Sequence, residues 1–168
     1  FMIDGRNTAE VFLANMNYAL VGAAVVTQEY IDGIQNDYLM EVMTKYPDRF
    51  FVCGMCEFRK PGFYNQAVEL IDKGFKAIKI PGHRLQLKDG RVMLNSDEMM
   101  RMFHLMEDKG VILSIDMAEG DLQVGEMEEI ISECPYLKIA IGHFGMVTKP
   151  DWKKQIMLAR HKLSLIHI

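Results

Sequence analysis

The sequence lacks any apolar run long enough to cross a bilayer, because its longest apolar runs have the length of strands. It also lacks a basic excess, since 19 Lys and Arg residues face 23 Asp and Glu residues and the formal net charge is −4. These two absences give no reason to expect membrane insertion, nucleic-acid binding or attraction to anionic lipid surfaces. We therefore expect a small-molecule substrate, with no nucleic-acid and no membrane partner.

Cysteine is scarce, with Cys53, Cys56 and Cys134 as the only three. An odd and small number gives no disulfide framework, so we expect reduced thiols in a cytoplasmic protein. Cys53 and Cys56 form a CxxC, but no second CxxC completes a zinc site. Two small buried residues are the simpler interpretation.

No glycine-rich phosphate loop follows the first expected strand, which removes one reason to expect a nucleotide-binding Rossmann unit. What is present is a repeated alternation of amphipathic helical segments and short apolar runs. The apolar runs predict strands within residues 21–27, 50–56, 75–82, 111–117 and 137–143. One βα unit in every 25 to 35 residues or so is typical of a parallel sheet covered by helices. Five or six units are too few for a closed eight-unit barrel of about 250 residues.

Polar residues stand where these strands end: Gln28, Glu57, Lys79, Asp116 and His143. Right-handed crossovers would place all the strand exits at one edge of the sheet. Catalysis and ligand binding in α/β folds concentrate at that edge. We therefore expect these five side chains to share a rim.

His143 is the first candidate, because the run 137–145, LKIAIGHFG, ends its apolar part in this histidine. It suits a metal ligand or a general acid and base; the alternative is a buried histidine bonded to a neighbouring carbonyl. Asp116 suits a metal ligand or a catalytic carboxylate; the alternative is an acceptor that anchors the loop near Gly120 and Asp121. A carboxylate buried after ILSI needs a partner, because its desolvation is costly.

Lys79 and His83 are candidate substrate-binding residues. Lys79 can supply a cation for a substrate carboxylate or for a developing oxyanion; the alternative is a solvated or salt-bridged lysine. His83, after Pro81 and Gly82, can line the mouth of the pocket; the alternative is a surface loop histidine. Glu29 is a weaker candidate for substrate contact, as are Glu57 and Arg59. His104 lies on an expected helix and is interpreted as structural.

Several strings in order resemble the amidohydrolase superfamily, specifically the amidohydrolase-2 group. They are AEVFLANMNYALVGAAVV, YLMEVMTKYPDRFFVCG, AVELIDKGFKAIKIPG and ECPYLKIAIGHFG, which together span nearly all of residues 8–160. The resemblance implies a TIM-barrel scaffold shared by metal-dependent hydrolases and decarboxylases. Two features depart from that pattern. The HxH metal pair of the family's first strand is missing, and Asp116 stands where the fifth strand usually ends in a metal-binding histidine.

The resemblance therefore implies an incomplete TIM-like (β/α) barrel of parallel βα repeats, a fragment that lacks both ends and is inactive alone. Residues 1–162 would form one partial barrel domain, and 163–168 are either the next strand or a non-native tail. An open barrel edge favours association into a homo-oligomer. The implied activity is metal-dependent hydrolysis of a lactone, ester or amide bond in a small carboxylated molecule. A divalent metal, Zn²⁺ or similar, would be held by His143 and Asp116, which are also the catalytic residues.

Three alternatives remain open from the sequence. The first is non-oxidative decarboxylation on the same scaffold. The second is an aldolase-type barrel in which Lys79 forms a Schiff base. The third is a truncated chain without catalysis.

Overall fold

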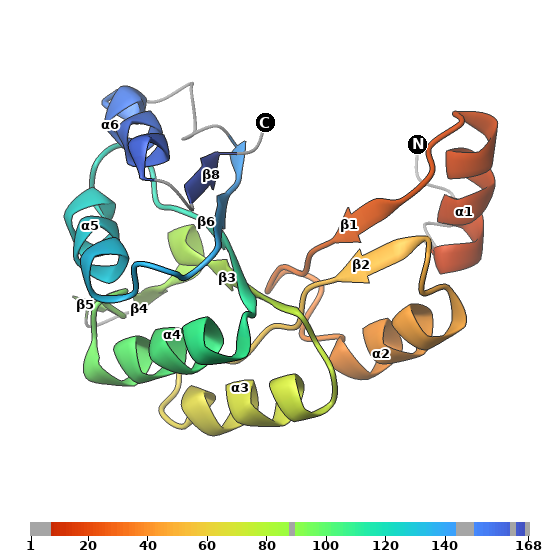
Figure 1. The fold of residues 1–168 in the computed structure, drawn as a ribbon, viewed down its shortest axis with the longest axis horizontal. Coiled ribbons are helices and arrows are strands. Elements are labelled where there is room, and N and C mark those ends of the chain that lie inside the picture. The colour runs from red at the N-terminus through yellow and green to blue at the C-terminus, as the bar shows by residue number, and fades with distance from the viewer. Residues whose placement is uncertain (1–7, 88–89, 144–149, 162–163, 167–168) are drawn as a thin grey trace.

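Helices and mostly parallel strands alternate along the chain in a computed structural model that describes residues 8–87, 90–143, 150–161 and 164–166 (Figure 1). The helices are α1 (Ala9–Tyr18), α2 (Asn36–Lys45), α3 (Phe63–Asp72), α4 (Asp97–Lys109), α5 (Val124–Glu133) and α6 (Trp152–Met157), with 3-10 turns η1 (Gly82–Arg84) and η3 (Leu158–Arg160). The strands are β1 (Ala24–Val26), β2 (Phe50–Val52), β3 (Ala77–Pro81), β4 (Gln86–Leu87), β5 (Gly90–Arg91), β6 (Ile112–Asp116), β7 (Ile139–Ile141) and β8 (Ser164–Ile166). None of the described helices has the length and apolar character needed to cross a membrane.

The parallel strands follow one another in space in the order in which they occur in the chain. β1 pairs with β2, and β3, β6, β7 and β8 form a second parallel sheet in that order. A parallel bridge between Gly54 and Ile78 links β2 to β3. A doubly wound sheet would reverse its order at a switch point, whereas a barrel adds each strand beside the preceding one. The sheets do not close within the described residues, so the fold is an incomplete TIM-like barrel of βα repeats.

Local signals in the sequence account for the helix ends. The Oγ1 atom of Thr8 accepts a hydrogen bond from the backbone N–H of Val11 and caps α1. α4 begins with two acidic residues and ends at Gly110, whose φ of +66° is the left-handed conformation that closes a helix. The short strands β4 and β5 pair in antiparallel fashion, with Gln86 opposite Arg91 and Leu87 opposite Gly90.

The two faces of the central strands carry different side chains. In β3, β6 and β7 every second residue is an isoleucine or leucine that packs against the helices. These residues are Ile78, Ile80, Leu113, Ile115, Ile139 and Ile141. The residues between them point to the inner side of the barrel and are small or polar. Helices α3, α4 and α5 supply the other half of the core through residues such as Phe103, which is fully buried.

The expected strands contain the observed ones, and the differences lie at their ends. β1 and β2 have three residues each, whereas seven-residue strands were expected in both places. β2 is short because the chain beyond Cys53 leaves regular pairing after the single bridge at Gly54. Residues 164–166 form β8 beside β7, while 163, 167 and 168 lie outside the described residues.

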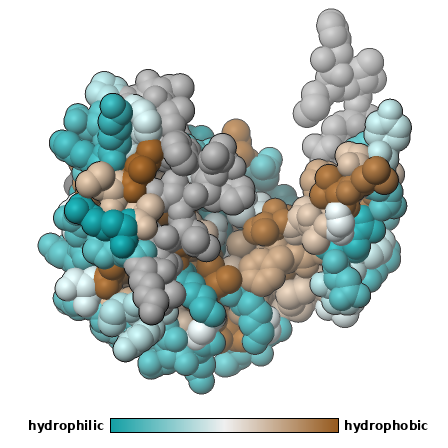
Figure 2. All heavy atoms as spheres, turned by 45° about the horizontal axis from the view of Figure 1, so that its top comes forward, coloured by the Kyte–Doolittle hydropathy of each residue, from teal (hydrophilic) through white to brown (hydrophobic). Residues whose placement is uncertain are grey.

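The N-terminal segment carries most of the exposed apolar side chains among the described residues. Figure 2 shows hydrophobic residues gathered on this segment, on its side toward the middle of the molecule. The exposed large apolar residues of this segment are Val11, Phe12, Tyr18, Leu20, Val21, Val25, Ile31, Ile34 and Tyr38. A surface of this kind is typical of one that another polypeptide covers. Self-association into a homo-oligomer stays a prediction.

The core makes a direct stability prediction. Phe103→Ala should lower the free energy of unfolding by about 3–5 kcal/mol, because it removes a large side chain from a filled core. Phe51, which is 39% exposed on the inner side of β2, offers a matched control. Phe51→Ala should cost much less in the same denaturant titration, and equal losses for the two variants would contradict the described core.

Candidate active site

The register of the parallel sheet brings two of the expected site residues together. Lys79 pairs with Ser114, and Asp116 lies two residues further along β6 on the same face. On the next strand Ala140 pairs with Ser114, and Gly142 follows two residues later. The inner face at this edge therefore presents an ammonium and a carboxylate among small residues.

These residues line a hollow of about 350 Å³ at the carboxyl ends of β3, β6 and β7. Its lining residues are Val25, Thr27, Lys79, Ser114, Asp116, Ala140, Gly142 and His143. Asp116 and His143 thus open into a common cavity, as the strand pattern predicted. A cavity of this volume lies in the range that accommodates a small molecule.

The carboxylate of Asp116 is the centre of the polar contacts in this hollow. Its Oδ2 atom forms an ion pair with the ammonium of Lys79, and both side chains are more than nine-tenths buried. The same oxygen lies 3.5 Å from Nε2 of His143. The His143 side chain is 62% exposed toward the cavity and has a φ of +56°, an uncommon conformation outside glycine. One buried anion therefore holds a cation on one side and orients an accessible imidazole on the other.

Glu29 and His83 approach the same carboxylate from two loops. Nε2 of His83 in η1 lies 4.0 Å from Oε2 of Glu29. One ligand atom from each of Glu29, His83 and Asp116 lies within 4.8 Å of the others, close enough to surround one metal ion. Both carboxylate oxygens of Glu29 are buried, and neither has a hydrogen-bond partner among the residues that the structure describes. Two carboxylates and one imidazole form a donor set that suits Zn²⁺ or Mn²⁺.

Other residues expected at this rim fix the loops instead. The side chain of Gln28 is buried, donates to the carbonyl of Cys53 at 2.9 Å and accepts from the N–H of Gln35 at 2.7 Å. Glu57 pairs with Arg59 at 2.8 Å. Neither Gln28 nor Glu57 lines the hollow, so the shared rim holds for Lys79, Asp116 and His143 but not for these two.

A tyrosine completes the scaffold beneath the Glu29 loop. The hydroxyl of Tyr30 donates to the carbonyl of Cys56 at 3.2 Å and accepts from the N–H of Phe58 at 2.9 Å. The guanidinium of Arg59 lies over its ring at 3.7 Å from the centroid. Burial raises the pKa of Tyr30 to about 12, so its hydroxyl stays protonated and holds both contacts at neutral pH. Tyr30 is the residue that follows Glu29 in the sequence.

The cysteines take no part in a CxxC site. Cys53, Cys56 and Cys134 are free and buried. Burial raises the pKa of the Cys53 thiol to about 11 and that of Cys56 to about 12. These two thiols are therefore protonated at neutral pH and act as small apolar side chains.

The sequence suggested His83 as a substrate-binding residue and Glu29 as a weaker candidate for substrate contact, and it did not predict that their side chains approach Asp116. The approach of their side chains to Asp116 depends on η1 and on the Gln28 contacts, and neither is visible in a hydrophobic pattern. One signal was available. Strands β3, β6 and β7 read AIKIP, ILSID and IAI, so apolar residues alternate with Lys79, Ser114 and Ala140. That alternation marks the inner face of a barrel.

The family assignment agrees with this architecture. A family model described as amidohydrolase, the amidohydrolase-2 family, matches residues 2–166. The chain belongs to this family. A search of curated proteins found no match to this amidohydrolase-family chain.

Solved structures share the fold of this amidohydrolase chain at low sequence identity. A probable 2-pyrone-4,6-dicarboxylic acid hydrolase from Acinetobacter baumannii, solved with citric acid, has a TM-score of 0.72 and 18% identity, covering 98% of this chain and 63% of that one. A 2,6-dihydroxybenzoate decarboxylase from Rhizobium has a TM-score of 0.65 and 16% identity, covering 92% and 59%. A 5-carboxyvanillate decarboxylase from Novosphingobium aromaticivorans, complexed with manganese, has a TM-score of 0.61 and 19% identity, covering 90% and 52%. The chain thus spans 52% to 63% of the length of these three structures.

The packing of Asp116 makes a prediction about a glycine. A Cβ atom on Gly142 would lie 2.1 Å from Oδ1 of Asp116, so Gly142→Ala must push that carboxylate away. We expect Gly142→Ala to lower the free energy of unfolding. The control is Gly125→Ala in α5, where a Cβ meets nothing within 4 Å. The control should stabilise the helix by up to about 1 kcal/mol. A Gly142→Ala chain as stable as the parent in a denaturant titration would contradict the described contact.

Proposed function

We propose that the hollow at the carboxyl ends of β3, β6 and β7 is the active site of a metal-dependent hydrolase. Its substrate would be a small carboxylated molecule with a lactone, ester or amide bond. The observation that carries this proposal is the convergence of Lys79, His143 and Glu29 on the buried carboxylate of Asp116. The reaction belongs to the protein that carries this chain, and the chain supplies the residues named here.

A metal ion fits the residues at this site. The buried oxygens of Glu29 have no hydrogen-bond partner among the described residues, which is costly for a carboxylate unless a cation balances it. We assign Glu29, His83 and Asp116 as the residues that would hold the ion. A divalent ion bound there would polarise the carbonyl of the scissile bond. The sequence also suggested His143 as a ligand, and the test below decides between that role and proton transfer.

The charge balance supports a carboxylated substrate. Glu29 and Asp116 contribute two negative charges and Lys79 one positive charge, so a divalent ion would leave the site with a net charge of about +1. An anionic group of the substrate would neutralise it. Lys79 lines the hollow and can donate to a substrate carboxylate or to an oxyanion that forms at the carbonyl carbon.

His143 is placed to move a proton. Its imidazole is exposed to the hollow, and the Asp116 carboxylate at 3.5 Å can stabilise the protonated ring. In hydrolysis the histidine would take a proton from the attacking water and return it to the leaving oxygen or nitrogen. Asp116 orients the ring, as carboxylates next to catalytic histidines do.

Decarboxylation is the second candidate, because two of the similar structures are decarboxylases of carboxylated aromatic compounds. There the carbon–carbon bond to the carboxyl group breaks, carbon dioxide leaves, and a proton from His143 takes its place on the ring carbon. The Schiff-base alternative requires Lys79 to leave its ion pair with Asp116 before its amine can attack a carbonyl. The truncated chain without catalysis is the remaining alternative.

The reaction type can be read from isotopes. The protein that carries this chain should be offered a panel of ring compounds with lactone and carboxylate groups in water enriched in oxygen-18, and again in deuterium oxide. Hydrolysis places oxygen-18 in the acid product, whereas decarboxylation releases carbon dioxide and places deuterium on carbon. We expect oxygen-18 incorporation. Trapping of substrate on Lys79 by borohydride would instead support the Schiff-base reaction and overturn the proposal.

Lys79→Met should abolish binding of the carboxylated substrate, because it removes the cation in the hollow. Lys76→Met, on the exposed side of the same segment, is the matched control and should leave binding unchanged. Calorimetric titration measures both. Lys79→Met also leaves a buried carboxylate without its partner, which costs about 3–5 kcal/mol. If the single variant unfolds, the double variant with Lys79→Met and Asp116→Asn removes both charges. Its comparison with Asp116→Asn alone isolates the contribution of Lys79 to binding.

Metal content separates the two roles of His143. Asp116→Asn should lower the bound metal measured by elemental analysis, because it removes a charged ligand. His143→Asn should retain the metal but lose turnover, since a proton carrier is not needed for binding. Loss of metal in His143→Asn would assign it as a ligand, and unchanged metal in Asp116→Asn would contradict the proposed donor set.

A further inference from the structure

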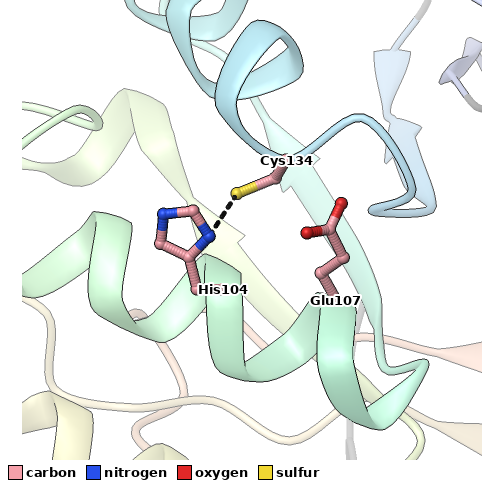
Figure 3. A group of neighbouring side chains, drawn as sticks. All are labelled: His104, Glu107 and Cys134. Atoms are coloured by element: carbon pink, nitrogen blue, oxygen red, sulfur yellow. Dashed lines mark hydrogen bonds between the residues drawn. The ribbon is translucent and has the colours of Figure 1, made fainter.

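A second group of metal-binding side chains lies between α4 and the end of α5 (Figure 3). His104 and Glu107 are three residues apart on one face of α4, and Cys134 follows the last residue of α5. One ligand atom from each residue lies within 4.8 Å of the others. We propose that His104, Glu107 and Cys134 form a zinc site that joins α4 to the connection between α5 and β7.

The spacing of the two softer ligands fits zinc. Nδ1 of His104 lies 3.5 Å from Sγ of Cys134. In a tetrahedral site with Zn–N of about 2.0–2.1 Å and Zn–S of about 2.3 Å, these two atoms are separated by about 3.6 Å. The pair can therefore bind one ion with small adjustments of its side chains. A thiolate and an imidazole favour Zn²⁺ over Mg²⁺, Ca²⁺ and Mn²⁺.

The other ring nitrogen of His104 faces a carboxylate. Nε2 lies 4.0 Å from Oε2 of Glu133. Histidines that bind a metal through one nitrogen commonly donate from the other to a carboxylate, which fixes the tautomer and the ring orientation. Glu133, which is not one of the three ligands, is placed for this role.

The charges around the cluster also suit a cation. The carboxylates of Glu107, Glu133 and Asp108 lie near the thiol of Cys134. Negative charges that oppose a thiolate would stabilise a divalent cation at the same point. Oε1 of Glu107 already accepts the N–H of Tyr136 at 2.6 Å, which fixes this carboxylate next to the α5–β7 connection. Three protein ligands leave the fourth position to water.

The position of the cluster indicates a structural role. Cys134 precedes β7, and Glu107 lies in the last turn of α4 before β6. The cluster therefore lies toward the amino ends of strands whose carboxyl ends form the hollow. In barrels of this type, function gathers at the carboxyl ends and stability at the amino ends. A zinc ion here would tie two outer helices together.

Titration with cobalt(II) gives a signal that distinguishes the proposed site of His104, Glu107 and Cys134 from the site in the hollow. A thiolate bound to cobalt(II) produces a charge-transfer absorption in the near ultraviolet, and Glu29, His83 and Asp116 include no thiol. The 168-residue chain titrated with cobalt(II) should develop this absorption, and one equivalent of zinc should remove it. Cys134→Ser should abolish it. Glu133→Gln should weaken the cobalt affinity about tenfold, as the loss of a carboxylate that orients a ligand does.

The variants are chosen so that misfolding cannot imitate the result. The His104 side chain is half exposed, so His104→Ala should fold and still lose the absorption. His161→Ala is the matched histidine control, and Glu29→Gln is the control for the site in the hollow, because the Glu29 carboxylate makes no hydrogen bond among the described residues. Both should keep the absorption. Its absence from the parent chain, or its persistence in Cys134→Ser or His104→Ala, would overturn the zinc site and leave the proposed hydrolase untouched.

Discussion

A buried carboxylate must be balanced by a partner, and the ion pair between Asp116 and Lys79 meets this requirement. The two residues can meet only if β3 and β6 run parallel in the observed register, because a shift by one residue would turn one side chain toward the helices. The ion pair therefore depends on the register of the central sheet, and the same pair places two charged groups in the hollow. His143 depends on the same register through β7, since Gly142 must pack directly against the Asp116 carboxylate. The strand register that defines the central sheet therefore also defines the geometry of the candidate site.

Small residues on the inner face make room for a ligand. A complete barrel of this class fills its interior with layers of bulky branched side chains. Here Ser114, Ala140 and Gly142 occupy inner positions near the strand exits, while the isoleucines of the same strands point to the helices. The result is a hollow with a polar floor at the edge where the loops meet. Val25 and Thr27 of the N-terminal segment also line it.

Sequence patterns predicted the parts of this arrangement that arise from local chemistry. Each of the five expected segments contains a strand, because a short apolar run that ends in polar residues has few other ways to bury itself. The meeting of Asp116 and His143 followed from parallel strands alone. The pattern could not separate these residues from Gln28 and Glu57, which also follow strands but bind loop backbone and Arg59. Only the three-dimensional path of the loops decides which polar side chain turns inward.

The two candidate metal-ligand groups differ in their donor atoms and in their positions in the fold. Glu29 and His83 come from loops at the carboxyl ends of strands, and with Asp116 they offer oxygen and nitrogen donors beside a cavity. His104 and Glu107 come from α4, Cys134 directly follows α5, and together they offer a thiol against a packed core. A hard donor set next to open space leaves coordination positions for a substrate, whereas a thiol that is 1% exposed leaves little room for one. A catalytic ion and a structural ion can therefore occupy separate sites in this fold. The donor atoms at each site select the metal, and the packing around the site determines whether a substrate can reach the ion.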